Sequence, residues 1–259
     1  MRGYRTSAIV SVIVGVLILG ALAFAVWQVP QGVAQEQQPL LQYPAYPPTP
    51  TMGPKPTSEP ALSGVPLAQA SFDTPDTLSS WTLVDLTTVL ADNRANWVVA
   101  DGRLVQDAAG RAKNPSIQET AALTGSPAWT DYTVQVSFYD EMNGTAGLIA
   151  RYQGSESTTA NYYRYRILKS TYAARPKQVL EKVEHGVATT LVEVEAPGFT
   201  ERTWNVVALT VVGGQLTVRL NGQVVAEGVD KTPLAAGQAG IYTRAIGGIF
   251  FDDFSVVAP

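Results

Sequence analysis

Three neighbouring segments in the middle of the chain constrain the fold more than any other feature of its sequence. They are residues 147–153, 161–167 and 179–186. Each interleaves β-branched or aromatic residues with polar ones, and Gly, Ser, Asn or Pro residues lie between the segments. This pattern is typical of β-strands, and the short spacing predicts three successive antiparallel strands across the middle of a β-sandwich.

Residues 131–139 alternate most cleanly. Aromatic and apolar side chains occupy every second position from Tyr132 to Phe138, and mainly polar side chains occupy the positions between them. A period of two predicts a strand with one face in the core. Between two apolar runs, Asp101 and Gly102 predict the tight turn of a hairpin over residues 96–106.

No helical periodicity of useful length follows residue 30, so the rest of the chain is expected to be strands and turns. Twelve to fourteen short strands predict an all-β fold, a two-sheet antiparallel sandwich. The remaining strands are expected at residues 116–120, 189–195, 204–212, 215–220, 223–227, 240–244 and 248–256.

The run G-L-I-A-R-Y-Q … N-Y-Y-R-Y-R-I … L-E-K-V-E-H-G resembles concanavalin A-like lectin and glucanase jelly rolls, of the lamin G-like and 3-keto-disaccharide-hydrolase-like kind. The resemblance can be followed over residues 71–257. It implies that a short edge strand at Phe72-Asp73 opens the domain and leads to Trp81. It also implies that the closing run F-F-D-D-F-S-V lies beside this first strand. Lectins, hydrolases and adhesion modules all use this jelly-roll fold.

The N-terminal residues predict a membrane anchor. Residues 8–28 form an uncharged, mainly aliphatic stretch that is long enough to cross a bilayer, for which about 20 residues are needed. Arg2 and Arg5 precede it, so residues 1–7 are expected in the cytoplasm and the C-terminal domain outside it, as in a single-pass protein of the cell membrane. A cleavable signal peptide is the alternative, because small residues at 21–25 offer processing sites. Either way the domain is exported.

Residues 29–69 are expected to be a disordered linker ahead of a jelly-roll domain at 70–259. The linker holds ten of the seventeen prolines, with Gln, Thr, Ser and Gly between them. Such a segment has too few apolar residues to bury and too many prolines for helix or sheet. It is interpreted as a stalk; a proline-rich docking site is the alternative.

Composition excludes several classes of site. The absence of cysteine rules out disulfides and thiolate chemistry, and the presence of a single histidine, His185, argues against a zinc site and against a Ser-His-Asp triad. From residue 70 onward there are 15 basic and 20 acidic side chains, a net charge of −5. A mildly acidic domain without a basic stripe argues against nucleic acid as a partner.

A dense set of tyrosines and arginines predicts a glycan site. Sugars stack on aromatic rings while planar polar groups hold their hydroxyls. Tyr163 and Tyr165 are expected in the core, which leaves the intervening residues on an exposed concave face. The predicted ligand-binding residues are Arg151, Tyr162, Arg164, Arg166, Tyr242 and Arg244. The alternative is that these residues form cross-strand pairs that only stabilise the sheet.

The resemblance also implies a structural calcium ion, because lectin-like jelly rolls often bind one where the first and last strands meet. Asp252 and Asp253 lie on the last strand and Asp73 on the first, and carboxylate oxygens suit this hard ion. The alternative is that these aspartates are solvated or bind neighbouring loops.

The acid motif of family 16 glycoside hydrolases, Glu-x-Asp-x-x-Glu, is not met. The nearest stretch, residues 193–198, has Glu195 where the motif has Asp and Gly198 where it has the acid/base. The sequence therefore predicts a non-catalytic module at the cell surface that binds a polysaccharide or another glycan. Two alternatives stay open: a glycoside hydrolase of the 3-keto-disaccharide hydrolase type, and a structural or adhesion domain that binds a cell-surface protein.

Overall fold

The computed structural model describes residues 62–259 except 89–93, 95, 107–117, 142–143, 156–157, 169–175, 197 and 246–247. The expected cytoplasmic tip, the expected membrane anchor at 8–28 and most of the expected linker lie outside these residues. Over the described ranges, no helix has the length and apolar character that crossing a bilayer requires.

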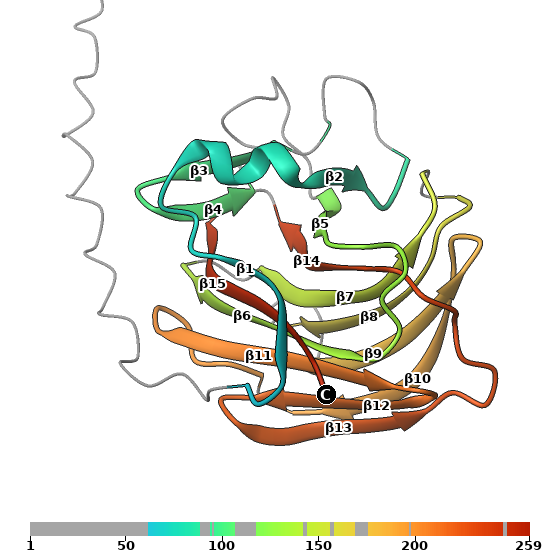
Figure 1. Ribbon diagram of the computed structural model, residues 1–259. Helices are drawn as coiled ribbons and strands as arrows, with labels where there is room; N and C mark the ends of the chain where they lie inside the picture. The colour runs from blue at the N-terminus through green and yellow to red at the C-terminus, as the bar shows by residue number, and fades with distance from the viewer. Residues whose placement is uncertain are drawn as a thin grey trace, which may run out of the picture. The chain divides into compact units, whose positions relative to one another are not determined.

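The described part consists of fifteen strands and one short 3₁₀ helix (Figure 1). The strands are β1 (Val65–Ala70), β2 (Thr82–Asp85), β3 (Trp97–Ala100), β4 (Arg103–Gln106), β5 (Gln118–Thr124), β6 (Tyr132–Asp140), β7 (Thr145–Gln153), β8 (Asn161–Leu168), β9 (Lys177–Glu184), β10 (Val187–Glu195), β11 (Trp204–Val212), β12 (Gln215–Leu220), β13 (Gln223–Val229), β14 (Gln238–Ala245) and β15 (Ile249–Ala258). The 3₁₀ helix, η1, spans Pro75–Ser80.

The strands form two antiparallel sheets. One has the order β13-β12-β11-β6-β15-β4-β3, with β1 also paired to β15, and the other has the order β10-β9-β8-β7-β14-β5-β2. The all-β two-sheet sandwich is thus confirmed. The three segments that dominate the sequence are β7, β8 and β9, which are neighbours in the seven-stranded sheet. The predicted turn between β3 and β4 is also present, with positive φ at Asp101 and Gly102.

β15 is central to the eight-stranded sheet. It pairs with β6 along most of its length, with β4 at Phe250 and Phe251, and with β1 from Phe254 to Ala258. The pairing of the last strand with the first, which the resemblance implied, is confirmed.

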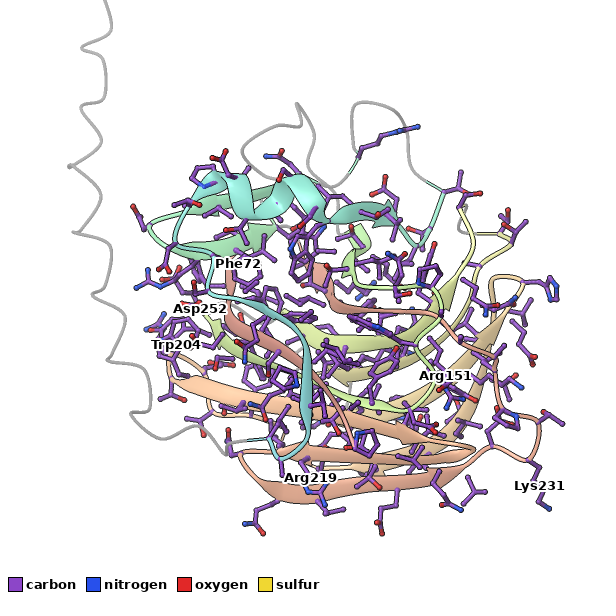
Figure 2. All side chains as sticks on the ribbon, viewed as in Figure 1. Phe72, Arg151, Trp204, Arg219, Lys231 and Asp252 are labelled. Carbon is purple, nitrogen blue, oxygen red and sulfur yellow. The ribbon has the colours of Figure 1, made fainter. Side chains whose placement is uncertain are left out.

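The opening of the domain differs from the expectation. β1 begins at Val65, five residues before the expected boundary, and the expected edge strand at Phe72-Asp73 is instead an irregular segment between β1 and η1. Phe72 has a φ of 52°, and its side chain is fully buried (Figure 2). Its ring lies 5.4 Å from that of Trp81, which in turn lies 4.8 Å from that of Phe254. These three rings close one edge of the core, so the conformation of the segment between β1 and η1 is set by ring packing rather than by strand pairing.

The core lies between the two sheets, and β8 shows how the alternation fills it. Tyr163, Tyr165 and Ile167 are fully buried in the main core cluster, which confirms their predicted face. Tyr162, Arg164 and Arg166 alternate with them and therefore lie on the outer face of the seven-stranded sheet. This outer face carries the candidate site.

Candidate functional site

Cross-strand pairing brings the predicted residues together on the outer face of the seven-stranded sheet. Arg164 on β8 lies opposite Glu181 on β9, and Arg244 on β14 lies opposite Glu119 on β5. Gly147 of β7 lies between Arg166 and Tyr242. Residues opposite each other in an antiparallel pair share a face, so the alternation of four strands sets this arrangement.

Five of these side chains form one connected set, which we call the arginine–glutamate network. Its members, in spatial order, are Arg166, Glu181, Arg164, Glu119 and Arg244. Glu181 accepts two hydrogen bonds from Arg166, at 3.0 and 2.8 Å, and lies 2.9 and 2.8 Å from two nitrogens of Arg164. Glu119 accepts from Nη1 of Arg164 at 2.9 Å, and its other oxygen lies 3.4 Å from Nε of Arg244.

The network is buried at its centre and open at its ends. Arg164 is 7% exposed and Glu181 4%, whereas the side chains of Arg166 and Arg244 are 21% and 44% exposed. Sequence reasoning placed Arg164 and Arg166 on an exposed face, and for Arg164 that was wrong. The three nitrogens of Arg164 bind the two carboxylates on either side, so the groups that remain accessible to a ligand are at Arg166, Glu119 and Arg244.

Tyrosine rings surround the network. The guanidinium of Arg164 lies 5.2 Å from the centre of the Tyr242 ring, and Tyr162 stacks on Tyr152 with centroids 5.5 Å apart. Gly147 makes room for Tyr242, because a Cβ there would meet the carbonyl oxygen of Tyr165 at 2.1 Å and the Tyr242 ring at 3.0 Å. Contrary to the expectation of open stacking surfaces, Tyr162 and Tyr242 are 3% and 0% exposed.

Two tyrosine hydroxyls on this face have no hydrogen-bond partner in the part of the chain that the structure describes. Among the described residues, the Oη atoms of Tyr152 and Tyr242 are buried without any hydrogen bond. Burial raises the pKa of Tyr242 above its ordinary value, and it raises the pKa of the neighbouring Tyr162 to about 12. The hydroxyls of Tyr242 and Tyr162 are therefore protonated at neutral pH. A buried, unpartnered donor costs ~1–3 kcal/mol, and such groups call for an explanation in a native protein.

Arg151, the sixth predicted ligand-binding residue, lies elsewhere. It is 3% exposed, and its guanidinium donates to the carbonyls of Thr130 and Leu234, each at 2.7 Å, and to Asp131 at 3.0 Å (Figure 2). Its backbone N–H donates to Oη of Tyr132 at 2.6 Å. Arg151 therefore fastens two loops to β7, and the prediction of an exposed ligand contact was wrong.

A β-bulge explains this error. The register of β7 with β8 shifts between Ala150 and Gln153, and Arg151 has a φ of 51°. The bulge interrupts the alternation that would have continued from Ile149 to Arg151 on the outer face. Tyr152 packs on that face instead.

The three aspartates of the predicted calcium site do not gather. Asp73 accepts from Oγ of Ser71 at 2.5 Å, while Oδ1 of the buried Asp252 accepts from the backbone N–H of Asp253 at 2.8 Å. Across the described ranges, no group of three or more His, Asp or Glu side chains is placed to hold a metal ion. Asp252 is buried, whereas Asp253 lies at a β-bulge: the register of β15 with β6 shifts between Asp252 and Ser255, and Asp253 has a φ of 49°. Calcium itself stays a prediction.

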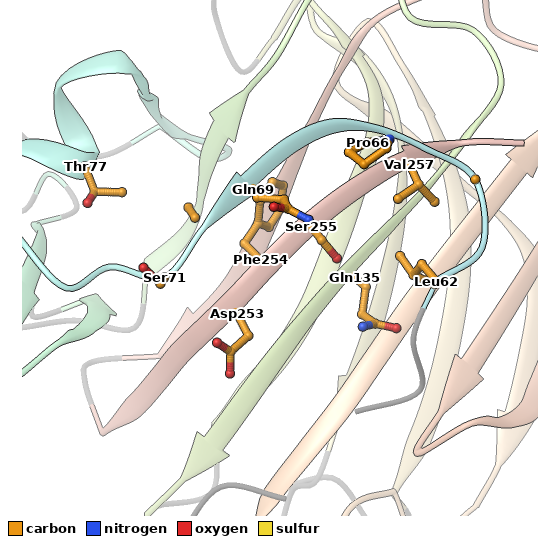
Figure 3. Close-up of a pocket in the computed structure, with 12 residues that line it drawn as sticks. Leu62, Pro66, Gln69, Ser71, Thr77, Gln135, Asp253, Phe254, Ser255 and Val257 are labelled. Atoms are coloured by element: carbon orange, nitrogen blue, oxygen red, sulfur yellow. The ribbon is translucent and has the colours of Figure 1, made fainter. Parts of the chain in front are cut away.

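Asp253 instead lines a groove of about 630 Å³ on the eight-stranded sheet (Figure 3). Its other polar side chains are Gln69 from β1, Ser71 just after β1, Thr77 from η1, Gln135 from β6 and Ser255 from β15. The groove lies apart from the arginine–glutamate network, which belongs to the other sheet.

The two residues that sequence reasoning missed on the candidate face are the carboxylates of the network. Glu181 could have been found, because pairing β8 with β9 as an antiparallel hairpin puts a carboxylate opposite an arginine. Glu119 could not, because β5 is joined to β14 only by long-range pairing. The other acid candidates lie apart: Glu193 binds Lys177 at 2.5 Å on the β9–β10 side, and His185 is exposed in the turn between those strands.

A two-sheet jelly roll of this topology is a concanavalin A-like domain. Within that class, the chain belongs to the family described as 3-keto-alpha-glucoside-1,2-lyase-like domain, whose model matches residues 68–256. No curated protein sequence gives a significant match.

Solved structures show the same fold at low identity. A Bacillus subtilis protein of unknown function with a galectin-like fold superimposes with a TM-score of 0.60 and 15% identity, over 75% of this chain and 96% of that one. The carbohydrate-binding module CBM66 from Bacillus subtilis gives 0.53 and 15%, over 69% and 96%. A Bacillus licheniformis β-glucanase gives 0.52 and 10%, over 76% and 100%.

Proposed function

We propose that this protein binds carbohydrate through the outer face of its seven-stranded sheet and does not turn the ligand over. One observation carries the proposal: a buried arginine–glutamate network lies beside tyrosines whose hydroxyls have no partner in the described part of the chain. Buried ion pairs add little to stability and buried unpartnered donors lower it, so their combination on one sheet face favours a functional site. The guanidinium and carboxylate groups that remain accessible suit sugar hydroxyls, which both donate and accept.

The similar structures support this proposal. They include a carbohydrate-binding module and a β-glucanase, both built on the same kind of sandwich. Their identities of 15% and 10% support the fold alone, so the sugar itself has to be found by experiment.

The test is binding of the full-length chain, purified in mild detergent, to a polysaccharide array. The double variant Arg166→Gln/Arg244→Gln removes the two open ends of the network, and Arg219→Gln, an exposed arginine on the other sheet, is the matched control. The proposal expects a selective signal that the double variant loses and the control keeps. A blank array with a stably folded protein would overturn it and direct the search to a protein partner.

Cleavage of a sugar is the second candidate, which the family description favours because it names a lyase. Incubating each bound polysaccharide with the protein and measuring released product separates the two. The carboxylates on the candidate face speak against turnover: Glu119 and Glu181 are each bound by two arginines, and Glu181 is also buried, so neither is placed to act on a substrate.

We further propose that residues 8–28 anchor the protein in the membrane and that residues 29–61 hold the domain outside the cytoplasm. The long uncharged stretch behind Arg2 and Arg5 supports this orientation. Protease added to intact cells should remove the C-terminal domain and leave the membrane-bound N-terminus. Protection of the domain until the cells are lysed would contradict the proposal.

A further inference from the structure

The arginine–glutamate network carries an unbalanced charge. It contains three guanidinium groups and two carboxylates, so it has one positive charge more than it neutralises. Residues 70–259 carry a net charge of −5, so this surplus runs against the balance of the domain. A positive surplus within an acidic domain points to an anionic group as its complement.

The surplus lies at the open ends of the network. Both carboxylates are bound to the buried Arg164, and Glu181 also binds Nε and Nη2 of Arg166. Arg244 is held only loosely by Glu119, at 3.4 Å, and is the most exposed member, with 44% of its side chain accessible. Its terminal nitrogens can therefore bind a planar anion through two parallel hydrogen bonds.

The face also has a direction. At its β10 edge Lys177 is bound by Glu193, so that lysine is already paired. The arginines that remain open to an anionic ligand stand on β8 and β14.

We propose that the ligand of this face is an acidic polysaccharide, one whose sugar residues carry carboxylates, as in a polyuronate. This inference rests on the proposed function and names its substrate class. Arg166 and Arg244 stand on β8 and β14, with β7 between them, so two strand spacings of about 4.8 Å separate their backbones across the sheet. Their partners on β7, Gly147 and Thr145, are two residues apart, which separates the arginines further along the strands. That span exceeds one sugar ring, so the two arginines meet carboxylates of different residues along a polymer.

The test compares polygalacturonate with the same polymer after its carboxyl groups have been reduced to alcohols. Binding of the full-length chain is measured by affinity electrophoresis, beside neutral glucans and polyglutamate, a polyanion without sugar. We expect reduction of the carboxyl groups to weaken binding at least tenfold, equivalent to ~1.4 kcal/mol. Arg244→Gln should weaken binding of the unreduced, acidic polymer by a similar factor. Arg244→Lys, which keeps the charge without the planar fork, should fall between the two, and Arg219→Gln should bind as the native chain does.

Each other outcome has a defined meaning. Equal binding of the native and the reduced polymer, or binding of neutral glucans alone, overturns the acidic ligand and leaves the proposed function standing. Equal binding of polyglutamate overturns it as well, because charge without sugar would then suffice. If no polysaccharide binds while thermal unfolding shows a folded protein, the proposed function falls together with this inference.

Discussion

Replacing Tyr242 by phenylalanine should stabilise the protein. The hydroxyl of Tyr242 is fully buried and has no partner among the described residues, so it has lost its hydrogen bonds to water without replacing them. Such a loss costs ~1–3 kcal/mol. Tyr242→Phe removes the hydroxyl and keeps the ring against Gly147 and Arg164, so the free energy of unfolding should rise by at least ~1 kcal/mol.

The same substitution two strands away should have the opposite sign. Tyr165 is also fully buried, but its hydroxyl donates to Oε1 of Gln178 at 2.7 Å. Tyr165→Phe breaks that bond and leaves a buried acceptor unpaired, which costs ~1–3 kcal/mol. Two chemically identical changes should therefore differ by ~2 kcal/mol or more.

Urea unfolding of both variants, followed by intrinsic fluorescence, measures the difference. The midpoints should move in opposite directions at an unchanged dependence on urea. In thermal unfolding, 1 kcal/mol corresponds to about 2–4 °C for a domain of this size. If Tyr242→Phe is destabilised as much as Tyr165→Phe, the hydroxyl has a partner, and the candidate face loses the feature that most favours a ligand site.

Three further predictions concern stability. The pKa of Tyr162 rises from 10.0 to about 12 on folding, so the contribution of its protonated hydroxyl to the stability of the folded state is complete below pH 10 and is lost as the pH rises toward 12. Tyrosinate absorbance recorded during alkaline unfolding measures this loss, and ionisation of Tyr162 near pH 10 in the folded protein would contradict it. Gly147→Ala should cost ~1–3 kcal/mol in urea unfolding, because its Cβ would meet a carbonyl oxygen at 2.1 Å; a neutral effect would show that β7 can move away. Arg151→Ala should lower the free energy of unfolding by ~3 kcal/mol or more, whereas Arg219→Ala should change it by no more than ~0.5 kcal/mol. Equal effects of the two substitutions would refute the role of Arg151 in holding the two loops to β7.

Alternation carried most of the sequence-based prediction. It assigned Tyr163 and Tyr165 to the core and Arg164 to the opposite face, because the period of two holds throughout β8. The prediction failed at Arg151 in β7, where a bulge interrupts this period. A single residue in the left-handed region shifts the facing of those that follow, and an arginine does not indicate such a position in the sequence as a glycine would.

The burial of the site could not be predicted for a different reason. The distances between Arg164 and its two glutamates depend on pairing between β8 and β9, which are adjacent in sequence, and between β14 and β5, which are more than 100 residues apart. The local sequence pattern predicts the pairing of β8 with β9, but it gives no information about the pairing of β14 with β5. The resemblance gave the jelly roll and the meeting of the first and last strands, and it also implied a calcium site, which stays a prediction.

The central position of β15 bears on how the chain acquires its structure. This strand follows all the other described strands in the sequence, yet β1, β4 and β6 all pair with it. Until β15 has left the ribosome, or the channel that exports the chain, β6 has an open edge and Phe251 and Phe254 are missing from the core. The domain therefore completes its folding only once β15 has emerged, and a chain truncated before Ile249 should present an unpaired strand edge that favours aggregation.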